Sequence, residues 1–247
     1  MKNNKFRHII INRYSDKEFS KNYYNNSKSG LKDYEKILVN KFLKKAKNIL
    51  VVGCGCGREV IPLAKENFNV TAIDISEEMV KQTKRLCKEF NVKAKVFQMD
   101  ATDLNFKPES FDAVLLLNSI IDQIPTHANR KRLSKGVYTV IKHGGICIVV
   151  SNNALYPGEK FCYWVEHIKE ILPYLANRRQ REFFDRIYND KNQQVYVHLS
   201  TPNYLKHLFR HFKIVLFSST DRLQGGDMDL VTNYFAPNLV MVAVKEI

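Results

Sequence analysis

Residues 49–60 read ILVVGCGCGREV, four apolar residues that lead into three alternating glycines. The pattern predicts a β-strand, a tight turn and the start of a helix. Glycines at such a turn allow positive φ angles and let the backbone approach a ligand closely. The free N–H groups at the start of the following helix form an electropositive end, and the whole arrangement is typical of a nucleotide-binding site.

The spacing around this turn indicates which kind of nucleotide fits. A second predicted strand, residues 69–73, ends in Asp74, and an acid at this place can accept hydrogen bonds from both ribose hydroxyls. A dinucleotide-binding loop needs its third glycine five positions after the first, but Arg58 stands there, and Gly57 comes one residue early. A phosphate-binding P-loop is excluded because no Gly-Lys-Ser or Gly-Lys-Thr follows. The sequence therefore favours an adenosine-containing ligand without a pyrophosphate.

In these features the chain resembles the class I S-adenosylmethionine-dependent methyltransferases. Their first motif has the form of residues 51–57, VVGCGCG, and their second strand ends in an acid like Asp74. The resemblance implies an α/β, Rossmann-like doubly wound fold with a seven-stranded, mostly parallel sheet whose last strand is antiparallel. It also implies S-adenosylmethionine as the cofactor and S-adenosylhomocysteine as the product. The alternative is a glycine turn that only packs a helix on a strand, but that turn would not predict the acid.

The composition is typical of one globular enzyme. At 247 residues with 45% hydrophobic content, the chain can bury a large core. The apolar run at residues 9–11 is too short for a signal peptide or a membrane span, so we expect a cytoplasmic protein. The five cysteines are odd in number, and we expect no disulfide. Cys54 and Cys56 have no further ligands nearby at metal-binding spacing, so we expect no metal site.

The first 48 residues carry much of the excess positive charge, with thirteen Lys or Arg against four acids. Such a flank can attract phosphates, although an amphipathic helix with lysines on its solvent face explains it as well. Residues 22–30 are rich in Asn, Ser and Gly, which predicts a mobile loop. In the resembling family such leading segments often fold over the cofactor. Tyr23 and Tyr24 are therefore candidate neighbours of the sulfonium through cation–π attraction.

Further candidates follow the predicted strands at one edge of the sheet. Ligands of open α/β sheets bind at the carboxyl ends of the strands, and strands 95–99 and 111–117 are each followed there by polar residues. The family uses an acid in the place of Asp100 to bind the adenine amino group. The candidate cofactor-binding residues are Tyr23, Tyr24, Gly53, Gly55, Gly57, Asp74, Ile75, Asp100, Ala101, Asn118 and Ser119.

A helix over about residues 129–141 and a strand at 146–150 complete the first half of the alternation. The apolar residues of this helix recur at helical spacing and predict its buried face. Its charged residues Arg130, Lys131, Arg132 and Lys135 are assigned to a solvated face.

Residues 152–192 interrupt the alternation of strands and helices. This segment is longer than an ordinary connection and rich in aromatic residues and arginines, which predicts one or two helices that form a substrate lid. Arginine pairs bidentately with carboxylates and phosphates, so the candidate substrate-binding residues Tyr156, Trp164, Arg178 and Arg179 suit an anionic small molecule. A helical subdomain whose aromatic residues form its own core explains the pattern equally well.

The chain after this insertion returns to the core. Residues 195–199 alternate as a strand that resumes the sheet, Thr201 and Pro202 predict a helix start, and two last strands follow at 212–217 and 239–244. The predicted organisation is a basic N-terminal segment and helix over the cofactor site (1–48), a methyltransferase core (49–151 and 193–247) and a helical substrate lid (152–192).

Methyl transfer from a sulfonium depends mainly on an acceptor held at attack distance and on the exclusion of water. A base is required only where the acceptor keeps its proton at neutral pH, and Asp122, His127 and His198 are the candidates. Residues 118–125 lack the motifs of amino-directed and cytosine-directed DNA methyltransferases, which disfavours base methylation of those two kinds.

The predicted function is methyl transfer to an oxygen or nitrogen of a small metabolite, with an anionic one favoured by the lid arginines. RNA is the alternative substrate, through the basic N-terminal flank and residues 130–135. A catalytically silent cofactor-binding or interaction protein is a further alternative.

Overall fold

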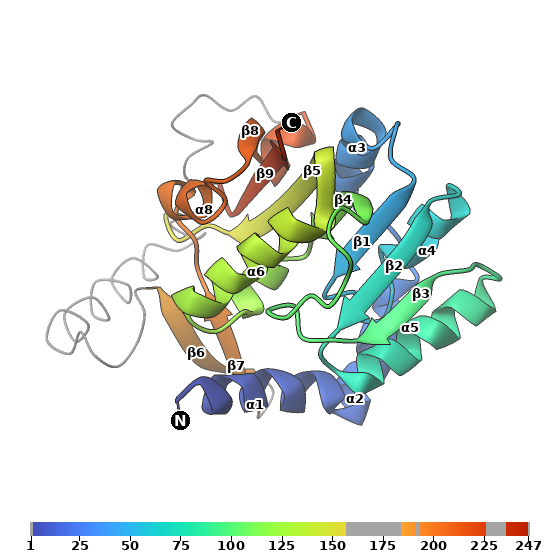
Figure 1. Ribbon diagram of the computed structural model, residues 1–247. Coiled ribbons are helices and arrows are strands. Elements are labelled where there is room, and N and C mark those ends of the chain that lie inside the picture. Colours follow the sequence, from blue (N-terminus) through green and yellow to red (C-terminus); the bar gives the residue numbers. More distant parts are fainter. Residues whose placement is uncertain (1, 157–183, 191–192, 226–235, 247) are drawn as a thin grey trace, which may run out of the picture.

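The computed structural model describes residues 2–156, 184–190, 193–225 and 236–246. Its centre is a seven-stranded sheet with the strand order β3-β2-β1-β4-β5-β9-β8 (Figure 1). The first five strands are parallel, and β9 runs antiparallel to both of its neighbours. The predicted seven strands and the reversed last strand are thus confirmed. The strands are β1 (Asn48–Val52), β2 (Asn69–Asp74), β3 (Lys95–Gln98), β4 (Phe111–Leu116), β5 (Ile141–Asn152), β8 (Lys213–Ser219) and β9 (Asn238–Val244).

Helices cover both faces of this sheet. Side chains alternate along each buried strand, so the strands present apolar residues to the helices on either face. Ile49 and Val51 of β1 pack in one cluster with residues of α3, α4 and α5, whereas Leu50 and Val52 pack in a second cluster with residues of α6 and α8. Apolar residues on both faces are what a doubly wound fold requires, and the family of folds expected from the sequence is confirmed. These helices are α3 (Asp33–Phe42), α4 (Val60–Lys65), α5 (Glu77–Glu89), α6 (His127–Val140) and α8 (Pro202–Leu208).

The N-terminal segment forms two further helices, α1 (Lys2–Ser15) and α2 (Lys17–Ser27). The predicted mobile loop at residues 22–30 is therefore wrong over most of its length. Asp16 caps α2 by accepting a hydrogen bond from the backbone N–H of Phe19. Tyr24 gives the helix a buried apolar contact that outweighs the low helix propensity of the Asn and Ser residues.

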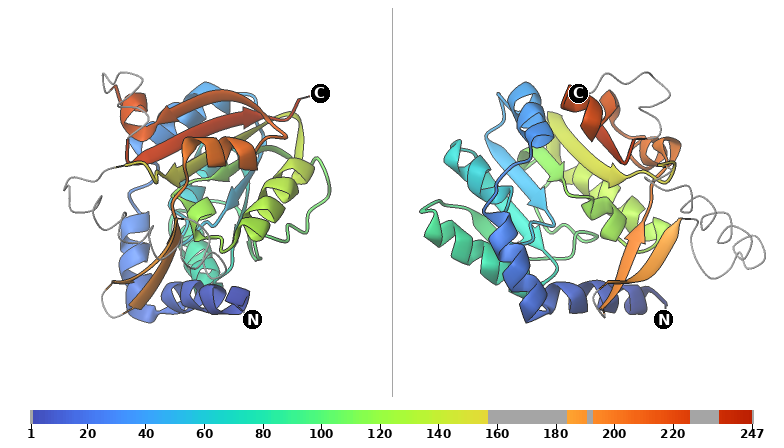
Figure 2. Two further views of the ribbon diagram at one scale, coloured as in Figure 1. Left: turned by 90° about the vertical axis from the view of Figure 1, so that its left-hand side faces the viewer. Right: turned by 180° about the vertical axis from the view of Figure 1, so that it is seen from behind.

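A separate two-stranded antiparallel sheet is formed by β6 (Asp185–Asp190) and β7 (Gln193–His198). Two expectations are corrected here: the strand near residue 195 does not resume the main sheet, and the end of the expected helical segment is a strand. The physical reason is that Tyr196 of β7 packs on Ile9 and Ile10 of α1, away from the main sheet. Figures 1 and 2 show the hairpin reaching from the core to α1.

Two short elements complete the fold, η1 (Ile120–Gln123) after β4 and α9 (Thr220–Leu223) after β8. Within the described ranges, no helix has the length and apolar character needed to cross a membrane.

Candidate cofactor site

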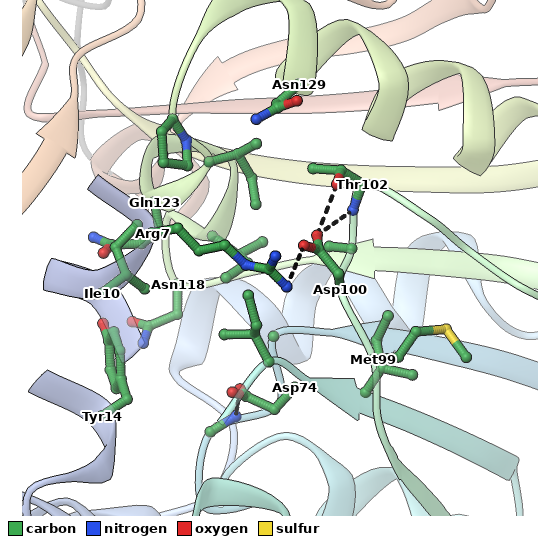
Figure 3. Close-up of a pocket in the computed structure, with 18 of the residues that line it drawn as sticks. Arg7, Ile10, Tyr14, Asp74, Met99, Asp100, Thr102, Asn118, Gln123 and Asn129 are labelled. Atoms are coloured by element: carbon green, nitrogen blue, oxygen red, sulfur yellow. Dashed lines mark hydrogen bonds and ion pairs between the residues drawn. The ribbon is translucent and has the colours of Figure 1, made fainter. Parts of the chain in front are cut away.

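A cavity of about 220 Å³ lies at the carboxyl ends of β1 to β4, and α1 forms part of its wall (Figure 3). Each of the four strands brings one predicted residue to the cavity wall: Gly53 after β1, Asp74 at the end of β2, Asp100 after β3 and Asn118 after β4. Because the four strands are parallel, residues from distant parts of the chain meet at this single edge.

Side chains from other parts of the chain pack directly against the glycine turn. Gly53 and Gly55 have φ angles of +68° and +53°, which L-residues with a side chain rarely adopt. A Cβ atom on Gly53 would overlap Ile120, and one on Gly55 would lie 2.8 Å from Cε1 of Tyr23. Glycine is therefore required at both positions by the backbone angles and by the close approach of Ile120 and Tyr23.

Gly57 has a different role in the structure. Its φ angle is +93°, and a Cβ atom there would lie 3.0 Å from Cγ2 of Thr83 on α5. It does not line the cavity. The third glycine therefore permits the close packing of α5 on the turn.

Asp74 stabilises the turn through hydrogen bonds and also lines the cavity. Its Oδ2 accepts a hydrogen bond from the N–H of Gly55, and its Oδ1 accepts one from the N–H of Ser76, each at 2.9 Å. Burial raises the pKa of the Asp74 carboxyl, and these N–H groups act against that rise by stabilising the anion. Each carboxylate oxygen has a further lone pair, so both can accept a hydroxyl of a ligand.

Asp100 makes an ion pair across the cavity. Its Oδ2 lies 3.0 Å from a guanidinium nitrogen of Arg7 on α1, while Oδ1 accepts hydrogen bonds from the N–H and hydroxyl of Thr102 (Figure 3). The acid that the family uses for the adenine amino group is thus engaged by an N–H donor from the N-terminal helix.

The turn after β4 aims a polar side chain at α2. Asn118 and Ser119 both have left-handed backbone angles, with φ of +53° and +58°, which are uncommon for residues with a side chain, although Asn adopts them more readily than most. The Asn118 amide donates a 2.9 Å hydrogen bond to the Tyr23 hydroxyl. Ser119 does not line the cavity but begins η1.

Of the two predicted tyrosines, only Tyr23 lines the cavity. Tyr24 is buried against α5, where its hydroxyl donates a 2.5 Å hydrogen bond to Glu89 and Arg85 lies over its ring. Successive residues of a helix point about 100° apart, so both could not face the same ligand once the segment is helical.

The apolar part of the wall includes the predicted Ile75 and Ala101 together with Met99 and Ile124. They line the same cavity as Asp100, so a flat ring held by that acid would have apolar side chains around it. The sequence pattern had indicated the first two because they directly follow the acids at the strand ends.

The sequence predicted that the N-terminal segment covers the cofactor site, but the residues of α1, η1 and α6 that line the cavity were not identified individually. Arg7, Ile10 and Tyr14 reach the cavity from α1, Gln123 reaches it from η1, and Asn129 reaches it from α6 (Figure 3). The apolar residues 9–11 were the local signal for the buried side of α1, but they had been considered only as a membrane or secretion signal.

None of the three predicted general bases lines this cavity. Asp122 is fully buried and accepts 2.6 Å hydrogen bonds from the Ser151 hydroxyl and the Asn152 N–H, which connects η1 to β5. His127 contacts the Tyr204 hydroxyl at 3.1 Å, and buried His198 contacts Asp185 at 2.9 Å. These contacts give each group a structural partner outside the cavity, and a role as general base stays a prediction.

Arg130 was predicted on a solvated face, but it is fully buried. Its Nη1 donates to the carbonyl of Ile124 at 2.8 Å and to the Tyr196 hydroxyl at 3.3 Å, and its Nε donates to the Tyr204 hydroxyl at 2.7 Å. Asp185 of β6 lies 3.7 Å from it. The guanidinium therefore joins the cavity wall, the β6–β7 hairpin and α8.

The predicted substrate lid is described only in part. Tyr156 is half-buried in the turn after β5 and does not line the cavity. Trp164, Arg178 and Arg179 lie outside the described residues.

Comparison with known proteins identifies a methyltransferase domain in the part of the chain that forms this cavity. Residues 49–145 match the family model described as "Methyltransferase domain". A ubiquinone biosynthesis O-methyltransferase from Rickettsia akari is 32% identical over 114 residues, which cover 46% of this chain and 43% of that protein. An eEF1A lysine and N-terminal methyltransferase homolog from Drosophila melanogaster is 30% identical over 119 residues, covering 46% of this chain and 18% of that protein. The matches thus span less than half the length of these curated relatives.

Two solved structures share the fold over most of the chain. A SAM-dependent methyltransferase from Methanosarcina mazei aligns with a TM-score of 0.67 at 22% identity, covering 88% of this chain and 99% of that one. The 1,6-didemethyltoxoflavin-N1-methyltransferase of Burkholderia thailandensis, solved with S-adenosylhomocysteine, aligns with a TM-score of 0.63 at 16% identity, covering 99% and 91%.

The matched part of the chain, with its glycine turn and strand-end acids, belongs to the class I S-adenosylmethionine-dependent methyltransferases. The cofactor of this class is S-adenosylmethionine, as the resemblance in the sequence had implied.

Proposed function

We propose that the protein transfers the methyl group of S-adenosylmethionine to a nitrogen or oxygen of a small metabolite. The observation that supports this proposal most strongly is the convergence of Gly53, Asp74, Asp100 and Asn118 in one cavity. The four free cysteines among the described residues suit a reducing cytoplasmic location, which we propose as well.

The residues of the cavity fit the cofactor. The backbone of Gly53 and Gly55 lines the cavity where the amino-acid part would lie, the free lone pairs of Asp74 suit the ribose hydroxyls, and Asp100 suits the adenine amino group. S-adenosylmethionine supplies an already activated methyl group. The contribution required of the chain is therefore to orient the acceptor and to exclude water, which can be worth roughly 7–11 kcal/mol.

The side chains around the cavity favour an acceptor that arrives with a free lone pair. Burial raises the pKa of Tyr14 to about 12 and also raises the pKa of Tyr23, so both hydroxyls keep their protons at neutral pH. The described cavity wall contains no histidine, and its two carboxylates are the ones proposed for the cofactor. An amine or an already ionised hydroxyl suits this environment. The enclosure of the cavity by α1 favours a small acceptor over a macromolecule.

Replacing Asp74 by asparagine tests the cofactor assignment. We expect titration calorimetry to show saturable binding of S-adenosylhomocysteine to the wild type and a loss of about 10–100-fold in the variant. Hydrogen bonds to a charged group are worth about 1.5–3 kcal/mol, and an amide cannot accept at both positions. Asp103→Asn, an exposed acid that does not line the cavity, is the matched control and should bind normally. Failure of the folded wild type to bind S-adenosylmethionine or S-adenosylhomocysteine would refute the proposed function.

Replacing Arg7 by alanine tests the ion pair across the cavity. If the adenine amino group binds Asp100, it must take the place of the guanidinium, so Arg7→Ala should bind S-adenosylhomocysteine up to about fivefold more tightly. This limit follows from the 0–1 kcal/mol typical of a partly exposed ion pair. Lys5→Ala removes the same charge from an exposed position of α1 and should leave the affinity unchanged. Weaker binding by Arg7→Ala would instead make Arg7 a direct contact of the cofactor.

A further inference from the structure

A second concave surface lies at the opposite end of the sheet from the cofactor cavity. This groove, the β3-edge groove, is open and about 1120 Å³ in volume. Asn69, Lys95 and Phe111, which begin β2, β3 and β4, lie in its wall together with the last turns of α5. Because the cofactor cavity lies at the carboxyl ends of the same strands, the two sites face opposite ends of the sheet. Figure 1 shows β3 and α5 together at one edge of the molecule.

Four exposed lysines line the β3-edge groove, and no described carboxylate does. They are Lys84, Lys88, Lys93 and Lys95. Other cations of α5 have partners, since Lys81 pairs with Glu77 at 2.9 Å and Arg85 lies over the ring of Tyr24. Within the described part of the chain, none of the four groove lysines pairs with an acid. The positive charge of the groove is therefore not compensated by the fold.

The closely spaced lysines of the groove destabilise the fold slightly, and no described contact within the molecule offsets this effect. Lys84 and Lys88 stand four residues apart on one helix, a like-charge spacing that is destabilising by a few tenths of a kcal/mol. Lysine on an edge strand can also serve to prevent sheet–sheet association, which would account for Lys95. That role does not account for the two helical lysines, whose charges point to an external anion.

Aromatic rings line the same groove, and Phe97 shares one face of β3 with Lys95. Phe97 of β3 is 44% exposed, and its ring meets that of Phe106 edge to face at 6.5 Å. Phe68 and Phe106 are half-buried in the same wall. An exposed aromatic face beside lysines is the combination that binds the bases and phosphates of unpaired nucleic acid, whereas an acidic peptide needs only the lysines.

We propose that the β3-edge groove binds a single-stranded nucleic acid segment, with its phosphates at the four lysines and a base stacked on Phe97. This docking surface goes beyond the proposed methyl transfer and does not depend on the cofactor. It also differs from the surface that the sequence suggested for RNA, because Arg130 is buried and the N-terminal flank is folded into α1 to α3.

The test uses fluorescence anisotropy with a short labelled oligouridylate and the full-length protein without cofactor. The groove variant replaces Lys84, Lys88, Lys93 and Lys95 by alanine. The control variant removes the same charge from four exposed lysines outside the groove, Lys17, Lys21, Lys131 and Lys135. We expect the groove variant to lose at least about tenfold in affinity and the salt dependence of log K to flatten by about 2–3, as four lost phosphate contacts on a single strand predict. The control should lose no more than about threefold.

A third variant, Phe97→Ala, separates stacking from charge. It should weaken binding at least about fivefold and leave the salt dependence unchanged, because stacking on an aromatic ring does not release ions. Equal losses in the groove and control variants would overturn the proposal, since they would show attraction by net charge alone. Unchanged binding by Phe97→Ala, together with equal competition by polyglutamate, would overturn it in favour of an acidic polypeptide.

Discussion

Replacing Arg130 by alanine should lower the free energy of unfolding by about 3–5 kcal/mol, the cost typical of removing one partner from a buried ion pair. The guanidinium is fully buried, and it is hydrogen-bonded to Ile124, Tyr196 and Tyr204. Its loss leaves the buried carboxylate of Asp185 with less compensating charge. Urea denaturation followed by circular dichroism measures the change.

The matched control for this prediction is Arg132→Ala, two residues further along the same helix. Arg132 is exposed and makes no ion pair with a described residue, so its loss should change the free energy of unfolding by less than about 0.5 kcal/mol. A loss below about 1 kcal/mol for Arg130→Ala would contradict the interpretation, because it would mean that the hairpin and α8 hold together without the guanidinium.

The second large effect is a pH dependence that Asp122→Asn should remove. Burial raises the pKa of the Asp122 carboxyl from 3.8 to about 7, although hydrogen bonds from Ser151 and Asn152 oppose the rise. Between about pH 4 and pH 7 the unfolded chain has therefore released this proton while the folded chain retains it, so stability falls as the pH rises through this window. The asparagine variant has no proton to release.

The measured quantity is the free energy of unfolding of wild type and variant at a series of pH values. Between pH 4 and pH 8 the free energy of unfolding of the variant should rise by roughly 2–4 kcal/mol relative to that of the wild type. This follows from about 1.4 kcal/mol for each unit of pKa. Asp103→Asn, an exposed acid, should run parallel to the wild type. Parallel curves for Asp122→Asn as well would show that this carboxyl is ionised in the folded protein at neutral pH.

The sequence correctly predicted those parts of the fold that depend on residues close together in the chain. The glycine turn, the strand-end acids and the helix start at Thr201 each depend on a few neighbouring residues, and the structure has Thr201 accepting a hydrogen bond from the N–H of Tyr204 as the cap of α8. The convergence of Asp74 and Asp100 followed from these local elements and the rule that parallel strands end at one edge.

The sequence predictions failed for residues whose positions are set by tertiary contacts. Arg7 reaches Asp100 only because α1 packs on a hairpin formed much later in the chain, and no local pattern encodes that contact. Arg130 is different, because its burial had a signal. It stands three residues before Leu133 and seven before Val137, so helical periodicity places it on the buried face, and its charge alone had suggested solvent.

The position of β9 has a consequence for how the chain acquires its fold. β9 lies between β5 and β8 in the sheet and pairs with both, although it is the last of the three in the sequence (Figure 1). During synthesis β8 therefore leaves the ribosome before the strand that connects it to the sheet exists, while β1 to β5 can already assemble. Non-local pairings of this kind close slowly and leave strand edges exposed in the meantime. The nascent chain should thus pass through a stage in which β5 presents an open apolar edge, and the completion of β9 ends its exposure to chaperones and to aggregation.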